Sequence, residues 1–79
     1  MKVNIGTFKK RDGTLRTMKF VKINDLPSLF LESKLKGGKQ HNTHPGEEIV
    51  WDLEKGNFRV FSWNSLVGEV ETFEQNTVI

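Results

Sequence analysis

The chain has 79 residues, of which 35% are hydrophobic, no cysteine, and a formal net charge of +2. This length predicts one small domain, residues 1–79, whose core contributes only about 3–5 kcal/mol of net stability. The lack of cysteine excludes disulfides and thiolate metal sites. No apolar run approaches the ~20 residues of a membrane span, and the first residues lack the apolar stretch of a secretory signal. We therefore expect a soluble domain inside the cell.

A first β-hairpin is predicted over residues 3–22. Asp12-Gly13 is a preferred pair for a two-residue type I′ turn, which places Ile5 opposite Phe20 on a shared apolar face. A three-residue loop closing on Gly13 would place Ile5 opposite Lys19 and scatter the apolar side chains over both faces. A strand pair with only one buried face does not tolerate such scatter, so the pattern favours the two-residue turn.

A second β-hairpin is predicted over residues 48–63. Its turn contains Gly56 either as the second residue of a type I′ pair or as the first residue of a type II′ pair, and both alternatives stay open. Either turn places Phe58 on the same face as Trp51, which we expect to be the core face. In both registers Arg59 lies opposite an acidic residue of the preceding strand, which predicts a cross-strand ion pair.

The remaining segments complete a mainly β fold. Apolar spacing after Asp25 predicts a helix of two or three turns that covers the core, and glycines and a proline indicate a flexible basic loop at about residues 33–46. A single 3₁₀ turn is expected near residues 64–68, then a strand over residues 67–73 and a loose tail at 75–79. Four strands, a 3₁₀ turn and a closing strand are typical of a five-stranded SH3-like barrel, here with one short helix between strands 2 and 3.

Charge is distributed unevenly along the chain. Residues 1–39 hold ten Lys/Arg and three Asp/Glu, whereas residues 40–79 hold two Lys/Arg and seven Asp/Glu. Cations beside an aromatic side chain can bind a nucleic-acid backbone and stack a base, although solvated hairpin tips and protected strand edges also carry lysines. The residues that we predict to bind nucleic acid are Phe8, Lys9, Lys10, Arg11, Arg16, Lys19, Lys34, Lys36 and Lys39.

A protein partner is the alternative hypothesis, in which the domain inhibits or redirects a host enzyme. Val50, Phe61 and Trp63 point away from the face of Trp51, and large apolar side chains seldom lie on a surface without a partner. Alternatively, closure of the barrel and the short helix would cover these three apolar side chains within the domain itself. The acidic half adds surface residues for a basic partner, namely Glu69, Glu71 and Glu74. A continuous basic face would favour nucleic acid, and self-association through strand edges stays open.

No catalytic, metal or cofactor site is predicted. His41 and His44 lie in a loop that lacks the rigidity to fix ligand geometry, and no third ligand stands at a recognisable spacing. No nucleophile with an adjacent base is indicated either. We therefore expect a binding module that is not an enzyme.

Two segments carry a resemblance to a known family. Residues 8–16 (Phe-Lys-Lys-Arg-Asp-Gly-Thr-Leu-Arg) and residues 58–64 (Phe-Arg-Val-Phe-Ser-Trp-Asn) resemble small Sm-like SH3 β-barrels of phages and bacteria, a family named for its likeness to WYL domains. The family motif is a Lys-Asp-Gly-Thr-x-Arg hairpin. The chain contains no tyrosine and hence no Trp-Tyr-Leu triplet, so no WYL binding residues are transferred. The resemblance implies an Sm-like barrel from a phage or bacterium, and with it a location in the bacterial host cytoplasm.

Overall fold

The structure of the protein, a computed structural model, describes residues 1–35 and 43–76. Within these ranges the elements follow the predicted order of two strands, a helix, two strands, a 3₁₀ turn and a last strand. In chain order they are β1 (Lys2–Lys9), β2 (Leu15–Lys22), η1 (Ile23–Asp25), α1 (Ser28–Leu35), β3 (Glu47–Asp52), β4 (Asn57–Ser62), η2 (Trp63–Ser65) and β5 (Leu66–Glu74). The prediction of a small, mainly β domain with one short helix between the second and third strands is confirmed.

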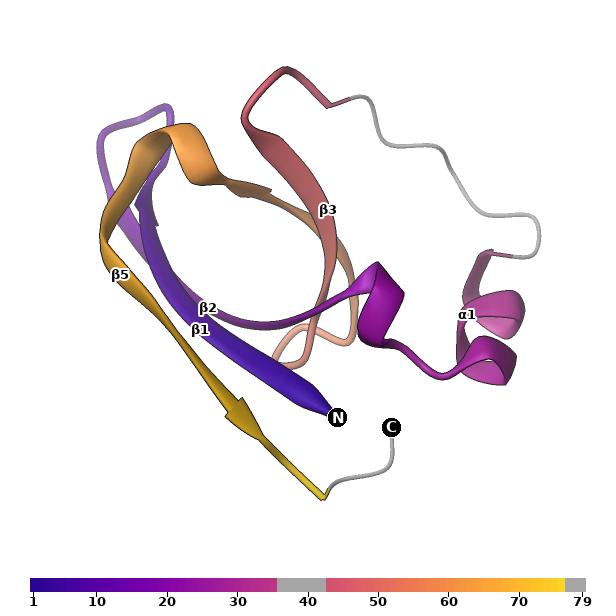
Figure 1. The fold of residues 1–79 in the computed structure, drawn as a ribbon. Helices are drawn as coiled ribbons and strands as arrows, with labels where there is room; N and C mark the ends of the chain where they lie inside the picture. Colours follow the sequence, from indigo (N-terminus) through magenta and orange to yellow (C-terminus); the bar gives the residue numbers. More distant parts are fainter. Residues whose placement is uncertain (36–42, 77–79) are drawn as a thin grey trace.

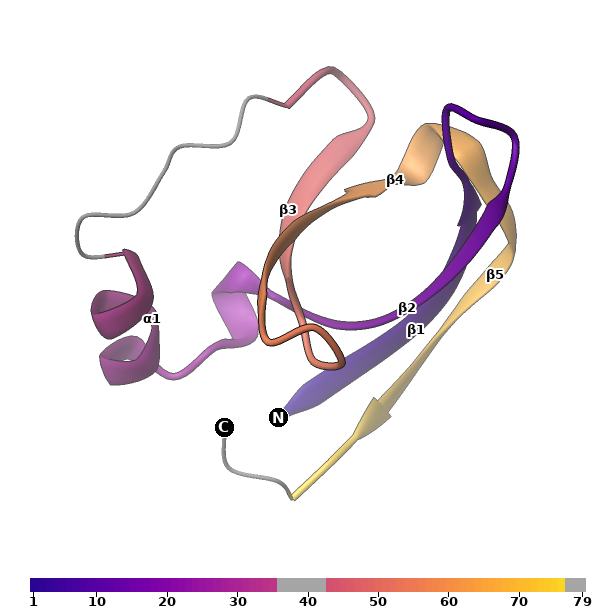
Figure 2. The same cartoon turned by 180° about the vertical axis from the view of Figure 1, so that it is seen from behind.

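The strands form one antiparallel sheet in the order β4-β3-β2-β1-β5. The sheet is strongly curved, and β4 comes round toward β1 (Figures 1 and 2). In the described part of the chain, β5 pairs along β1 and shares no ladder with β4. The sheet is therefore not closed into a barrel, and the prediction of closure is wrong, because the outer edges of β4 and β5 have no strand partner among the described residues.

The first hairpin has the register that the sequence argument rejected. Ile5 lies opposite Lys19, and the loop spans three residues, from Arg11 to Gly13. Gly13 adopts a positive φ of 89°, while no described residue other than glycine has a positive φ. A type I′ turn needs positive φ at both central residues, so it is excluded, and the loop matches a type I turn followed by a left-handed glycine.

Buried side chains lie on both faces of the curved sheet, which is why this register is tolerated. The inner cluster fills the concave face and consists of Phe8, Met18, Phe20, Val50 and Phe61. The outer cluster lies on the other face and consists of Val3, Val21, Leu26 and Trp51. The assumption of a single buried face was wrong, because curvature encloses one face while α1 and neighbouring segments cover part of the second.

The second hairpin keeps the predicted faces but not the predicted turn. Trp51 and Phe58 are direct partners, and their rings meet edge to face at 5.0 Å. The loop, however, covers four residues, 53–56, and Gly56 takes a φ of 68°. Arg59 consequently lies opposite Val50 rather than Asp52 or Glu54. The predicted cross-strand ion pair is therefore wrong.

The helix α1 lies beside the sheet and packs on the outer cluster (Figure 1). Phe30 meets Trp51 edge to face at 4.9 Å, as expected for a helix that covers the core. Leu29, the residue before Phe30 in the helix, is 82% exposed. In the described ranges, no helix has the length and apolar character needed to cross a membrane.

A bulge bends β5 where it passes Gly6. Ile5 pairs with Glu71 and Thr7 with Val67, so β5 carries extra residues between these pairs, as in a β-bulge. A Cβ atom on Gly6 would stand 2.8 Å from Phe61 Cζ and 2.9 Å from Val70 Cγ2. The missing side chain therefore allows β4 and β5 to approach β1 closely.

The two ends of the described chain are tied together. The amino group of Met1 lies 3.2 Å from the Glu74 carboxylate, and the Gln75 N–H donates to the Met1 carbonyl at 2.9 Å. Gln75, which was predicted to belong to a loose tail over residues 75–79, is therefore bound to the first residue of the chain. Residues 77–79 lie outside the described part.

Gly13→Val is expected to destabilise the protein by about 1–2 kcal/mol, because a side chain raises the energy of the left-handed conformation. A Cβ at this position would meet nothing within 4 Å, so the effect would come from the backbone alone. Gly13→Asn is the matched control, since asparagine visits the left-handed region readily. Thermal unfolding would measure both, and an unchanged Tm for the valine variant would contradict the loop assignment.

Candidate functional site

Two adjoining hollows lie between the tip of the first hairpin and β4, and together we call them the basic cleft. The first hollow has a volume of about 420 Å³ and is lined by Phe8, Lys9, Lys10, Arg11, Glu47, Val60, Ser62, Asn64 and Ser65. The second has a volume of about 280 Å³ and is lined by Phe8, Lys10, Arg16, Met18, Arg59 and Val60. The hollows share Phe8, Lys10 and Val60, so they form a continuous surface.

The hairpin tip is held by its own side chains. The Asp12 carboxylate accepts hydrogen bonds from the Thr14 hydroxyl at 2.6 Å and the Thr14 N–H at 3.0 Å. These two bonds hold the pKa of Asp12 below its ordinary value of 3.8. The Lys10 N–H and the Thr14 carbonyl close the loop at 2.8 Å. These hydrogen bonds fix the conformation of the loop next to which the cations of the hairpin tip lie.

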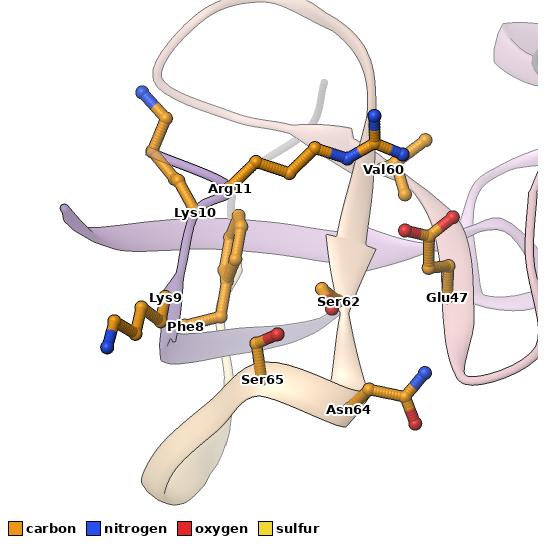
Figure 3. Close-up of a pocket in the computed structure, with 9 residues that line it drawn as sticks. All are labelled: Phe8, Lys9, Lys10, Arg11, Glu47, Val60, Ser62, Asn64 and Ser65. Atoms are coloured by element: carbon orange, nitrogen blue, oxygen red, sulfur yellow. The ribbon is translucent and has the colours of Figure 1, made fainter. Parts of the chain in front are cut away.

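The opposite wall of the first hollow depends on Gly46. Its carbonyl accepts hydrogen bonds from the N–H groups of Trp63 and Asn64, at 2.8 and 3.2 Å. The Asn64 side chain donates to the Pro45 carbonyl at 2.6 Å. These contacts fasten the segment before β3 to η2, next to Ser62 and Ser65 in the wall (Figure 3).

Three exposed cations and one carboxylate surround the first hollow. Lys9, Lys10 and Arg11 are exposed, and the Arg11 side chain extends toward the β4 side of the hollow, where Val60 lies (Figure 3). The acidic member is Glu47, whose carboxylate accepts a hydrogen bond from the His44 N–H at 2.9 Å. The first hollow is therefore positively charged overall, as expected for the hairpin tip.

Arg16 is fixed by a buried ion pair rather than free at the surface. Its Nη2 lies 2.6 Å from Oδ2 of Asp52, whose side chain is 0% exposed, while the Arg16 side chain is 25% exposed. The other oxygen of Asp52 accepts hydrogen bonds from the N–H groups of Glu54 and Lys55. One carboxylate thus positions both a cleft cation and the turn after β3.

Phe8 was predicted to lie on the outward face of the hairpin, and this prediction is wrong. It is only 8% exposed and packs edge to face on Phe61 with ring centroids 5.1 Å apart. In the observed register of the hairpin, the Phe8 side chain lies on the concave face of the sheet, together with Met18. Phe8 is therefore a wall of the cleft and cannot offer a full ring face to a base.

The other predicted cations do not join the cleft. Lys19 lies with its Nζ 5.9 Å from the centre of the Phe73 ring. Lys34 belongs to α1 rather than to a loop, and its Nζ lies 5.7 Å from the Phe30 ring centre and 5.8 Å from that of Trp51. Lys36, Lys39 and His41 lie outside the described residues.

Two of the three apolar residues predicted to contact a protein partner are part of the interior. Val50 and Phe61 are both 0% exposed and belong to the inner cluster. Trp63 is half-buried against that cluster, and its Nε1–H donates to the Glu48 carboxylate at 2.9 Å. Glu69 and Glu71 are exposed on β5. Curvature of the sheet, which covers the concave face, is the physical reason for the burial of the apolar residues.

Arg59 was not among the predicted site residues. It was predicted to form an ion pair across the second hairpin, whereas its Nε–H donates to the Asn57 side chain at 3.0 Å and the residue lines the second hollow. The signal that would have revealed it is the four-residue loop, because that loop sets the register of β4.

Comparisons with known proteins give no match to a family model, a curated protein or a solved structure.

Proposed function

We propose that the protein is a small, non-enzymatic module that binds nucleic acid through the basic cleft. The observation that carries this proposal is the gathering of five cations around two adjoining hollows, namely Lys9, Lys10, Arg11, Arg16 and Arg59. The burial of Val50 and Phe61 supports this choice over a protein partner, because neither side chain is available for docking. A regulatory role in the cytoplasm of a phage-infected bacterium is part of this proposal.

Phosphate contacts would supply most of the affinity. Lysine and arginine side chains that neutralise phosphates release counterions, which makes binding strongly dependent on salt. Such contacts position the backbone but carry little sequence information. Since Phe8 is buried, stacking of a base on its ring is not part of the proposed mode.

We also propose that the chain is an open relative of the Sm-like SH3 barrels. The order of four strands, a 3₁₀ helix and a fifth strand supports this relationship. The outer edges of β4 and β5, which have no strand partner within residues 1–35 and 43–76, distinguish it from a closed barrel.

Binding of a fluorescent oligonucleotide, followed by anisotropy across a salt series, tests the function. Affinity is expected to fall steeply between about 50 and 200 mM salt. The double substitution Lys9→Gln and Lys10→Gln is expected to lower the slope of log Kd against log salt by about two, one for each lost contact. The matched control is the pair Lys2→Gln and Lys34→Gln, which removes two exposed charges outside the cleft and is expected to leave the slope nearly unchanged.

No saturable binding of either DNA or RNA at low salt would contradict the proposal. An equal loss of slope in both double variants would contradict the assignment to the cleft. Circular dichroism of each variant would verify that its fold is retained.

A further inference from the structure

The second hollow of the basic cleft has an unusual balance of charge. Its lining includes Lys10, Arg16 and Arg59, together with apolar walls from Phe8, Met18 and Val60. Among the residues that line it in the described part of the chain, none is acidic. The first hollow, by contrast, includes Glu47. The second hollow is therefore the better place for an anion.

Two guanidinium groups at this hollow are already held in place. Asp52 binds Arg16 through Nη2, and Asn57 accepts a hydrogen bond from Nε of Arg59. The Nε–H of Arg16 is buried and has no acceptor among the described residues. The contact with Asp52 through Nη2 therefore leaves this donor of the Arg16 guanidinium unused. Arginine presents its donors in a planar fork that matches the oxygens of phosphate. Donors positioned before binding lose less conformational entropy when the ligand arrives.

The charges near this hollow suit a phosphate group. Asp52 offsets one of the three cations because its carboxylate pairs with Arg16. The excess is therefore about two positive charges, from Lys10 and Arg59. We infer that the second hollow binds a single phosphate group of the nucleic-acid backbone between Arg16 and Arg59. The phosphate site follows from the residues of the hollow, whereas the assignment of the phosphate to a nucleic acid rests on the proposed function.

Titration of the protein with inorganic phosphate, observed by nuclear magnetic resonance, tests the site without any nucleic acid. The chain has three arginines, Arg11, Arg16 and Arg59, so their Nε–H signals can be assigned individually. Saturable shifts are expected for Arg16 and Arg59, with a smaller change for Arg11, which lines only the first hollow. The same two signals are expected to move when an oligonucleotide is added.

Arg59→Gln and Arg11→Gln form a matched pair, since each removes one exposed arginine from one hollow. Loss of a charge-assisted hydrogen bond is expected to weaken phosphate binding about tenfold in Arg59→Gln, and Arg11→Gln is expected to stay within about twofold, as for a contact outside the site. Equal effects in the two variants, or no saturable shift of Arg16 and Arg59, would overturn the inference even if oligonucleotides bind elsewhere. Phosphate binding that depends on Arg59 without oligonucleotide binding would support the site and contradict the proposed function.

Discussion

Replacing Phe61 with alanine is expected to cost about 3–5 kcal/mol and to unfold most of the protein at 25 °C. Truncation of a buried phenylalanine removes its transfer free energy and leaves a cavity. Phe61 is 0% exposed and its ring contacts those of Phe8, Phe20 and Trp63 at centroid distances of 4.6–5.1 Å. The loss is comparable to the whole net stability expected of a domain of this size.

Phe73→Ala is the matched control for Phe61→Ala. Phe73 is 39% exposed on β5 and contacts the ammonium of Lys19, so its truncation is expected to cost less than about 1 kcal/mol. Urea unfolding followed by circular dichroism would measure both variants. A Phe61→Ala protein as stable as the Phe73→Ala protein would be incompatible with a central position of Phe61 in the core.

Asp52→Ala is expected to destabilise the protein by roughly 3 kcal/mol. Removing one member of a buried ion pair leaves its partner with an uncompensated charge, which costs about 3–5 kcal/mol for fully buried groups. The lower end applies here because the Arg16 side chain is 25% exposed. The variant also removes the acceptor for the N–H groups of Glu54 and Lys55.

Asp52→Asn separates the two contributions of this side chain. An amide oxygen can still accept from the turn but carries no charge for Arg16, so an intermediate stability is expected. Glu54→Ala removes an exposed carboxylate nearby and is expected to change stability by less than about 0.5 kcal/mol. Equal unfolding midpoints for Asp52→Ala and Glu54→Ala would contradict the structural role of the ion pair.

Local sequence signals located the strands but not their register. The alternation around Trp51 and the glycines at 13 and 56 were sufficient to predict both hairpins and the shared face of Trp51 and Phe58. Loop length depends on backbone conformation and on bonds such as that between Asp12 and Thr14, which a pattern of apolar residues does not report. A shift of one residue then moved Phe8 from the predicted outer face to the inner one.

The candidate site was predictable only where it is local in sequence. Lys9, Lys10 and Arg11 are neighbours in the chain, and they line the same hollow as expected. Arg16 and Asp52 are separated by 36 positions, and their pairing depends on how β2 and β3 meet in the curved sheet. The same long-range arrangement brings Arg59 into the cleft. A charge count along the chain contains no information on such contacts.

The space left by the absent side chain of Gly6 also determines how the outside of the molecule is shaped. Phe61 and Val70 both come within 3 Å of the position that a Cβ atom would take. Phe61 follows Val60 directly in β4, and Val60 lines both hollows across from the hairpin. A side chain at position 6 would require Phe61 or Val70 to shift, and a shift of β4 at Phe61 is expected to change the position of Val60 and Arg59 relative to Lys10. The spacing of the cations on the surface thus depends on a buried residue that lines neither hollow.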